Sequence, residues 1–94
     1  MEIQHSDNGK NGSFYVEIDG QREAEMTYYY KDETTIDIDH TEVSKSLQGT
    51  GIGYQLIEEA VRFMRNKNLT ALTSCSYAKA IFEKRQAEYQ DLIK

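Results

Sequence analysis

Alternation of apolar and polar residues runs through the first half of the chain and is typical of half-buried β-strands. Residues 13–18 are rich in β-forming side chains and precede Asp19-Gly20, a dipeptide that favours a two-residue type I′ hairpin turn. Residues 21–30 then return with one apolar face, formed by Ala24, Met26, Tyr28 and Tyr30. The polar cluster at 8–12 fits either a further hairpin turn or a plain loop. The pattern predicts an antiparallel meander of strands.

A turn at 31–33 leads into another predicted strand, residues 34–43. Strict alternation places Ile36, Ile38 and His40 together on one face of this strand. The opposite face would carry Asp37, Asp39 and Thr41. His40 is thus expected beside apolar side chains.

After Gly51 the apolar residues recur at the three- and four-residue intervals of an amphipathic helix. This stripe consists of Ile52, Leu56, Ile57, Ala60, Val61 and Met64. The polar run 66–68 ends the helix, residues 69–74 form a short strand, and residues 77–88 form a second helix. The tail at 89–93 suits either helix or strand. We therefore predict an α+β fold, in which a strand meander precedes a β-α-β-α unit, as one domain spanning residues 1–94.

Composition narrows the classes of function. The 94 residues include 16 acidic and 11 basic side chains, for a net charge of -5. This balance disfavours nucleic acid, which binds clustered Lys and Arg, and suits a cationic partner such as an amine, although solubility alone also explains it. No apolar run approaches the roughly 20 residues of a membrane span, and the N-terminus lacks a secretory-signal pattern. Because Cys75 is the only cysteine, we expect no disulfide, no multi-cysteine metal site and a cytoplasmic location.

A glycine-rich segment at 47–54, Leu-Gln-Gly-Thr-Gly-Ile-Gly-Tyr, connects a predicted strand to a predicted helix. Glycines let the backbone approach a ligand closely, and the unpaired N–H groups of a first helical turn attract phosphate oxygens. A P-loop would need Lys followed by Ser or Thr after its last glycine, and a Rossmann site would need glycine at Tyr54. Both interpretations fail, which leaves another phosphate ligand or a turn that serves packing alone.

The Gln-x-x-Gly-x-Gly pattern at 48–53 resembles the pyrophosphate motif of the GNAT superfamily of acetyltransferases. With Asp-His-Thr-Glu-Val at 39–43 and Ser-Cys-Ser-Tyr at 74–77, the chain is similar to the small single-domain YjdJ-like GNAT subfamily. The closing Glu-Tyr-Gln-Asp-Leu at 88–92 fits as well, so the resemblance covers roughly residue 20 to the C-terminus.

That resemblance implies acetyl-CoA binding in a cleft where the strand of His40 separates from the strand at 69–74. Backbone groups at 41–43 would pair with the pantetheine arm, and N–H groups of the loop would hold the pyrophosphate. The predicted cofactor-binding residues are Thr41, Glu42, Val43, Gln48, Gly49, Thr50, Gly51, Ile52, Gly53 and Cys75.

Three residues are candidates for the catalytic roles that acetyl transfer to an amine requires, namely a base, a nucleophile and an acid. His40 could be the base, since imidazole exchanges protons near neutral pH, or a satisfied core histidine. Cys75 precedes a predicted helix, where a thiol ionises more easily; it could accept the acetyl group, contact CoA only, or be simply buried. Tyr77 stands near the position of a tyrosine general acid in many GNAT enzymes, or it packs. Many subfamily members carry proline where this chain has Ser76.

The acceptor is not readable from the sequence. The chain is shorter than a typical GNAT enzyme, and the N-terminal strand and two helices that grip the acceptor are not recognisable in it. We expect a small-molecule or protein amine as acceptor, with a partner protein or second subunit completing the site. His5 is assigned no role in a terminus expected to fray. The predicted function is N-acetyl transfer from acetyl-CoA; the alternatives are an acyl-CoA binding or sensing module without turnover, and a purely structural domain.

Overall fold

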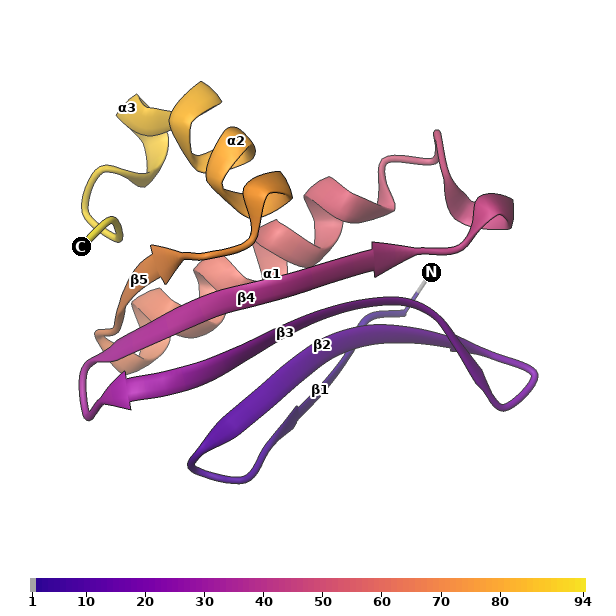
Figure 1. Cartoon of the computed structure of the whole chain (residues 1–94), viewed down its shortest axis with the longest axis horizontal. Helices are drawn as coiled ribbons and strands as arrows, with labels where there is room; N and C mark the ends of the chain where they lie inside the picture. Colours follow the sequence, from indigo (N-terminus) through magenta and orange to yellow (C-terminus); the bar gives the residue numbers. More distant parts are fainter. Residues whose placement is uncertain (1) are drawn as a thin grey trace.

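The computed structural model describes residues 2–94 and begins with an antiparallel meander (Figure 1). Its strands are β1 (Gln4–Asp7), β2 (Asn11–Ile18), β3 (Gln21–Asp32) and β4 (Thr35–Val43). The second half contains the 3₁₀ turn η1 (Lys45–Leu47), α1 (Ile52–Lys67), β5 (Thr70–Thr73), α2 (Ser76–Lys84) and α3 (Gln86–Tyr89). The sheet follows chain order, and β5 pairs with β4 in parallel. The predicted α+β fold is confirmed.

Both local turn signals form as their chemistry requires. Asp19 and Gly20 have φ angles of 51° and 80°, and positive values at both central residues define a type I′ turn. The upstream polar cluster is a second hairpin turn, because β1 pairs with β2 on either side of it. Asn68 adopts the left-handed conformation (φ 57°) and ends α1, as the polar run predicts.

The prediction of one helix over residues 77–88 is wrong in extent, because this segment forms two helices, α2 and α3. Arg85, at φ -111° and ψ 34°, interrupts the helical backbone between α2 and α3. Of the tail at 89–93, Tyr89 ends α3, residues 90–92 are turn, and Ile93 forms an isolated parallel bridge with Ala71 of β5. The tail is therefore neither a continuous helix nor a full strand.

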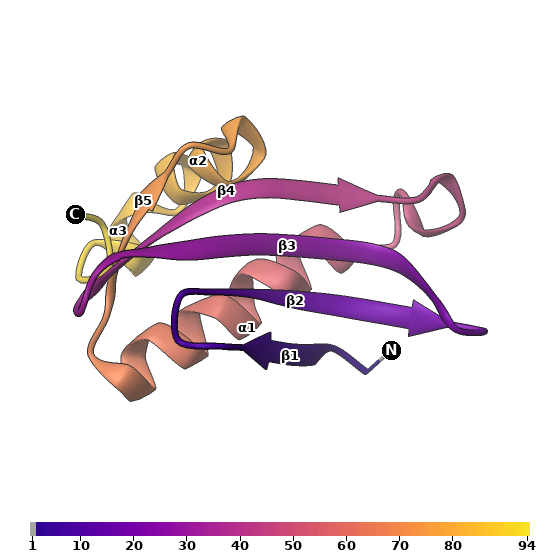
Figure 2. The same ribbon diagram turned by 60° about the horizontal axis from the view of Figure 1, so that its bottom comes forward.

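The hydrophobic core lies between the sheet and α1, which crosses behind the strands in Figures 1 and 2. The stripe predicted for α1 is buried along its whole length, from Ile52 to Met64. It meets the alternating inward residues of the meander, which are Phe14, Val16, Ala24, Met26, Tyr28, Ile36 and Ile38. Helices α2 and α3 lie beside β5 in Figure 1. Within residues 2–94, no helix covers the opposite face of the meander (Figure 1).

The strict alternation predicted for β4 is wrong, because a β-bulge interrupts it. Tyr28 of β3 pairs with Ile38, whereas the preceding Thr27 pairs with His40, so Asp39 is an extra residue on β4. An extra residue reverses which face each later side chain occupies. His40 therefore lies on the uncovered face, opposite to Ile38, and its side chain is 56% exposed.

The expectation of a frayed N-terminus is also wrong. His5 belongs to β1, stacks on Phe14 with ring centroids 4.1 Å apart, and has its Nε2 2.6 Å from the hydroxyl oxygen of Tyr28. Tyr28 and Tyr30 both donate hydrogen bonds to Asp7, at 2.6 and 2.8 Å. These contacts attach β1 to the rest of the sheet.

This N-terminal cluster shifts the titration of its members. Burial lowers the pKa of His5, although the charges of Asp7 and Glu59 oppose that effect. Burial also acts to raise the pKa of Asp7, but the hydrogen bonds that it accepts outweigh burial and lower it. Burial and then Asp7 raise the pKa of Tyr30 to about 12. In the described chain, no helix combines the length and apolar character needed to cross a bilayer.

Candidate functional site

An opening separates β4 from β5 at the carboxyl end of their parallel pairing. The pairing ends at Ile38 with Thr73, whereas β4 continues to Val43. The last backbone hydrogen bond across the pair runs from Cys75 N–H to the Ile38 carbonyl, at 3.0 Å. Beyond it, the edge of β4 from Asp39 to Val43 has no neighbouring strand on the side of β5 within residues 2–94.

The glycine-rich loop lies at the end of this opening, between β4 and α1. Gly49 and Gly51 have φ angles of 80° and 83°, a region that disfavours residues with a Cβ. The side-chain amide of Gln48 donates to the carbonyl of Val43 at 3.2 Å, and the Thr50 hydroxyl donates to the Leu47 carbonyl at 2.5 Å. Gln48 thus attaches the loop to the end of β4, and Thr50 attaches it to η1.

The amino end of α1 presents unpaired donors to this loop. The first hydrogen bond of the helix runs from Gln55 N–H to the Gly51 carbonyl, at 3.2 Å. Within residues 2–94, the N–H groups just before it, at Ile52, Gly53 and Tyr54, have no acceptor. Such donors, together with the positive end of the helix dipole, suit phosphate oxygens.

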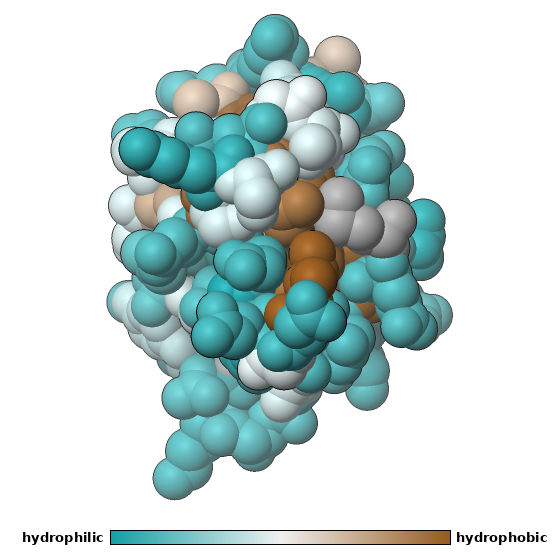
Figure 3. Space-filling model, turned by 90° about the vertical axis from the view of Figure 1, so that its right-hand side faces the viewer, coloured by the Kyte–Doolittle hydropathy of each residue, from teal (hydrophilic) through white to brown (hydrophobic). Residues whose placement is uncertain are grey.

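A pocket of about 460 Å³ connects the loop with the outer part of β4. Its lining consists of Thr41, Val43, Leu47, Gln48, Gly49, Gly51, Ile52, Gly53, Tyr54 and Tyr77. Figure 3 looks onto this end of the molecule and shows a narrow strip of apolar side chains between hydrophilic ones. The pocket therefore joins a polar backbone cradle to an apolar wall.

Most of the residues predicted for the cofactor site come together in this pocket. Thr41 and Val43 contribute from β4, because the bulge turns both toward the helices. The side chain of Glu42 is 73% exposed and lies on the same face of β4 as His40, away from the pocket. Glu42 could therefore contact a ligand in the pocket only through its backbone. Thr50 belongs to the loop but does not line the pocket. The sequence interpretation missed Leu47 and Tyr54, although both flank the glycine motif directly.

Tyr77 reaches the pocket from the first turn of α2. Its hydroxyl lies against Gly53, and the guanidinium of Arg85 stacks over the neighbouring Tyr54 ring, 4.7 Å from its centroid. Burial, followed by Tyr54 and Cys75, raises the pKa of Tyr77. The phenol therefore stays protonated at neutral pH and can donate a hydrogen bond.

Cys75 and His40 are not brought together. The thiol, in a residue only 9% exposed, donates to the Thr41 hydroxyl at 3.4 Å across the opening between β4 and β5. The His40 imidazole lies on the other face of the sheet, with its Nε2 3.3 Å from Glu42 Oε2. Cys75 precedes α2 directly, as predicted, with Ser76 as the first helical residue.

Comparison with known proteins gives a consistent result. A sequence model described as GCN5-related N-acetyl-transferase matches residues 13–92. Over 69 residues, the chain is 33% identical to protein NATD1 of Xenopus tropicalis, an alignment that covers 72% of this chain and 63% of that protein. Over 95 residues, it is 27% identical to protein NATD1 of Danio rerio, covering 99% and 84%. The chain thus spans less than two thirds of the frog protein.

Solved structures agree. A GCN5-like protein from Staphylococcus aureus is 38% identical, with a TM-score of 0.78 over 99% of this chain and 87% of that one. A GNAT family acetyltransferase from Elizabethkingia anophelis with acetyl-CoA bound is 17% identical, with a TM-score of 0.63 over 82% and 53%.

The fold is therefore that of the GCN5-like acetyltransferases. The chain belongs to the GCN5-related N-acetyltransferase (GNAT) family, a class of enzymes whose cosubstrate is acetyl-CoA. The family resemblance read from the sequence is confirmed, and the YjdJ-like subfamily stays a prediction.

Proposed function

We propose that this chain binds acetyl-CoA through the loop at 48–53 and transfers the acetyl group to an amine. The observation that carries the proposal is the combination of Gly49 and Gly51 at positive φ with the unpaired N–H groups that begin α1. The oxygens of a diphosphate would accept hydrogen bonds from these N–H groups. The loop also borders the pocket that extends along β4.

The remaining contacts fit the pantetheine arm, which is narrow and carries amide groups. On the side of β5, the β4 edge beyond Ile38 offers backbone groups that no strand of the described chain pairs, and Thr41 and Val43 line the adjoining pocket. Amides along an unpaired strand edge form the hydrogen bonds that a further strand would make. The arm would thus run beside β4 toward Thr41, whose hydroxyl accepts the hydrogen bond from Cys75.

The chemistry is assigned to Cys75 and Tyr77. The Cys75 thiol would give up its proton as its sulfur attacks the thioester carbonyl, which forms a carbon–sulfur bond and breaks the bond to the CoA sulfur. The CoA sulfur leaves as a thiolate and takes up that proton. The amine nitrogen would then attack the acetyl carbonyl, forming a carbon–nitrogen bond and breaking the bond to the Cys75 sulfur, which takes up the proton that the amine loses. Tyr77, whose phenol is protonated at neutral pH, supplies a hydrogen-bond donor at the pocket wall.

The test is isothermal titration of acetyl-CoA into wild type, Gly51→Glu and Gly20→Glu. Both glycines have positive φ (83° and 80°) and open space around them, so the two substitutions strain the backbone alike. Only the first places a carboxylate in the proposed phosphate site. We expect binding of about micromolar strength, or about -8 kcal/mol, for wild type and Gly20→Glu, and none for Gly51→Glu. Equal binding by both variants would place the cofactor elsewhere.

A second candidate, acyl-CoA binding without turnover, is favoured by the position of His40. The imidazole lies on the face opposite to the Thr41 side chain and bonds Glu42, so it is not placed to activate the thiol. CoA release that depends on an added amine and disappears in Cys75→Ala would establish transfer. Binding with no release for any amine would establish the second candidate.

The acceptor class rests on charge. The uncovered face near the opening carries the exposed side chains of Asp39 and Glu42, which suit a cationic amine of a small molecule or a protein. This face has no helix over it in the described chain, so a partner protein or second subunit could complete the acceptor site.

A further inference from the structure

A buried acid on β4 has no part in the site described so far. Asp37 is 4% exposed, although it lies on the face of β4 opposite to the Ile36 and Ile38 side chains, and it lines a pocket together with Lys79 and Glu83 of α2. It pairs with Tyr29 of β3 and with Leu72 of β5. A buried carboxylate is costly unless hydrogen bonds satisfy it. Both oxygens of Asp37 are satisfied: Oδ1 accepts from Ser74 N–H at 3.0 Å, and Oδ2 accepts from the Ser74 hydroxyl at 2.8 Å and the Tyr29 hydroxyl at 3.3 Å.

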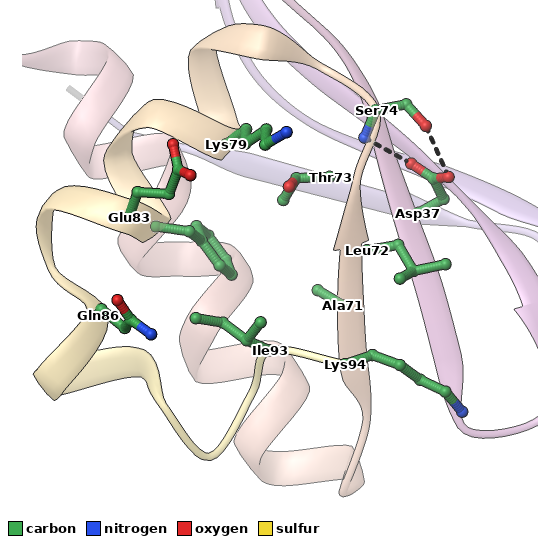
Figure 4. Close-up of a pocket in the computed structure, with 11 residues that line it drawn as sticks. Asp37, Ala71, Leu72, Thr73, Ser74, Lys79, Glu83, Gln86, Ile93 and Lys94 are labelled. Carbon is green, nitrogen blue, oxygen red and sulfur yellow. Dashed lines mark hydrogen bonds between the residues drawn. The ribbon is translucent and has the colours of Figure 1, made fainter.

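These bonds change how β5 ends. In a parallel ladder every second residue of β5 donates to β4, beginning with Thr70 N–H to the Thr34 carbonyl at 2.8 Å. The regular continuation would make Ser74 N–H the donor to the Ile38 carbonyl. Instead, Asp37 accepts from Ser74, and the next residue, Cys75, donates to Ile38 at 3.0 Å. The ladder therefore slips by one residue at Ser74. Figure 4 shows the two hydrogen bonds from Ser74 to the carboxylate of Asp37.

The slip decides where the thiol lies. Cys75 immediately follows the displaced Ser74 and is the N-cap residue of α2. Its thiol reaches Thr41 across the opening, and Thr41 lines the acetyl-CoA pocket. The Asp37 side chain, by contrast, does not line that pocket. Asp37 can thus act on the thiol only through Ser74.

We propose that Asp37 is a positioning residue, which holds the Ser74–Cys75 segment through its bonds to Ser74 and so places the thiol at the opening between β4 and β5. This rests on the proposed role of Cys75 in acetyl transfer. The geometry itself, however, is testable without any acceptor.

The experiment compares wild type and Asp37→Asn by the rate of Cys75 alkylation with iodoacetamide in the folded protein. An asparagine has the same shape, but an NH₂ group replaces one of the two carboxylate oxygens and cannot accept the hydrogen bonds that this oxygen takes. Loss of a charge-assisted hydrogen bond should make the Ser74–Cys75 segment open more often. The alkylation rate of Cys75 should therefore rise about tenfold. Acetyl-CoA affinity, by titration calorimetry, should stay within about threefold, since the pocket keeps its lining.

Three further variants separate positioning from general destabilisation. Ser74→Thr keeps the N–H and the hydroxyl and should alkylate like wild type, whereas Ser74→Ala, which loses the hydroxyl alone, should be intermediate. Val61→Ala, in the buried stripe of α1, destabilises the core at a position outside β5 and the Ser74–Cys75 segment, and should leave alkylation in native buffer unchanged. Ser74→Ala also keeps the test decisive if Asp37→Asn does not fold.

Wild-type alkylation rates in both Asp37→Asn and Ser74→Ala, or an equal increase in Val61→Ala, would overturn the proposal. Failure of the proposed function would look different, because wild type itself would then not bind acetyl-CoA.

Discussion

The hydroxyl of Tyr77 lies where a side chain on Gly53 would begin. Gly53 is the last glycine of the loop motif and already part of α1, whereas Tyr77 belongs to α2. The GNAT motif as read from the sequence allows alanine at this position, but in this chain the packing of α2 against α1 requires glycine. The same contact places the phenol beside the unpaired N–H groups of α1.

A double-mutant cycle tests that relationship. Gly→Ala within a helix normally gains about 1 kcal/mol, but at Gly53 the new methyl must displace the Tyr77 ring. The quantity to compare is the change in unfolding free energy that Gly53→Ala causes in wild type and in a Tyr77→Ala background. We expect this change to be about 1 kcal/mol more destabilising in wild type. Urea denaturation of the four proteins gives the coupling energy. Additive effects would show that the two residues do not interact.

The bulge at Asp39 predicts opposite results at neighbouring positions of β4. His40→Trp places a large side chain on the uncovered face, whereas Thr41→Trp fills the proposed acetyl-CoA pocket. Calorimetry should show acetyl-CoA affinity within about twofold of wild type for the first variant and at least about tenfold weaker for the second. The reverse order would mean that the cosubstrate binds on the other face of the sheet.

Gln48 is expected to hold the loop in register with β4. Gln48→Leu removes the donor to the Val43 carbonyl but preserves the approximate size of the side chain. If losing this hydrogen bond costs about 1 kcal/mol of binding free energy, the affinity for acetyl-CoA should be about fivefold weaker than in wild type. Gln55→Leu, at an exposed position of α1, is the matched control and should bind as wild type does. An equal loss in both variants would instead indicate a general effect of leucine on α1 and its loop.

Acidification should destabilise the fold through His5. Burial lowers its folded pKa below the unfolded value of about 6.5, so the unfolded chain binds the proton more readily. The contribution of His5 is therefore fully present above about pH 6.5 and is lost as the pH falls through the folded pKa. Urea unfolding at pH 7.5 and at pH 5.5 should show a smaller loss for His5→Gln than for wild type.

His40→Gln serves as the control for this pH dependence, because that side chain is exposed and does not contact the His5 cluster. It should lose as much stability on acidification as wild type. If His5→Gln also behaves like wild type, the destabilisation arises elsewhere in the chain.

The roles of Cys75, Tyr77 and the loop residues remain predictions from the sequence that these experiments address. The cytoplasmic location also remains a prediction. The candidate site was partly readable because its loop is contiguous: Gln48 to Gly53 is one stretch with a recognisable pattern. The residues that other strands and helices contribute could not be predicted from the local sequence pattern. Asp37 reads as one of several solvated strand carboxylates until β5 lies beside it and Ser74 bonds to it.

The sequence by itself determined the strand meander, the type I′ turn at Asp19-Gly20, the buried stripe of α1 and the family. Each of these follows from residues close together in the chain, through backbone propensity or the period of apolar side chains. Only the tertiary structure decided the face of His40, the fit of Tyr77 on Gly53 and the slip of β5 at Ser74. All three depend on the register between distant segments, which packing fixes and local pattern does not.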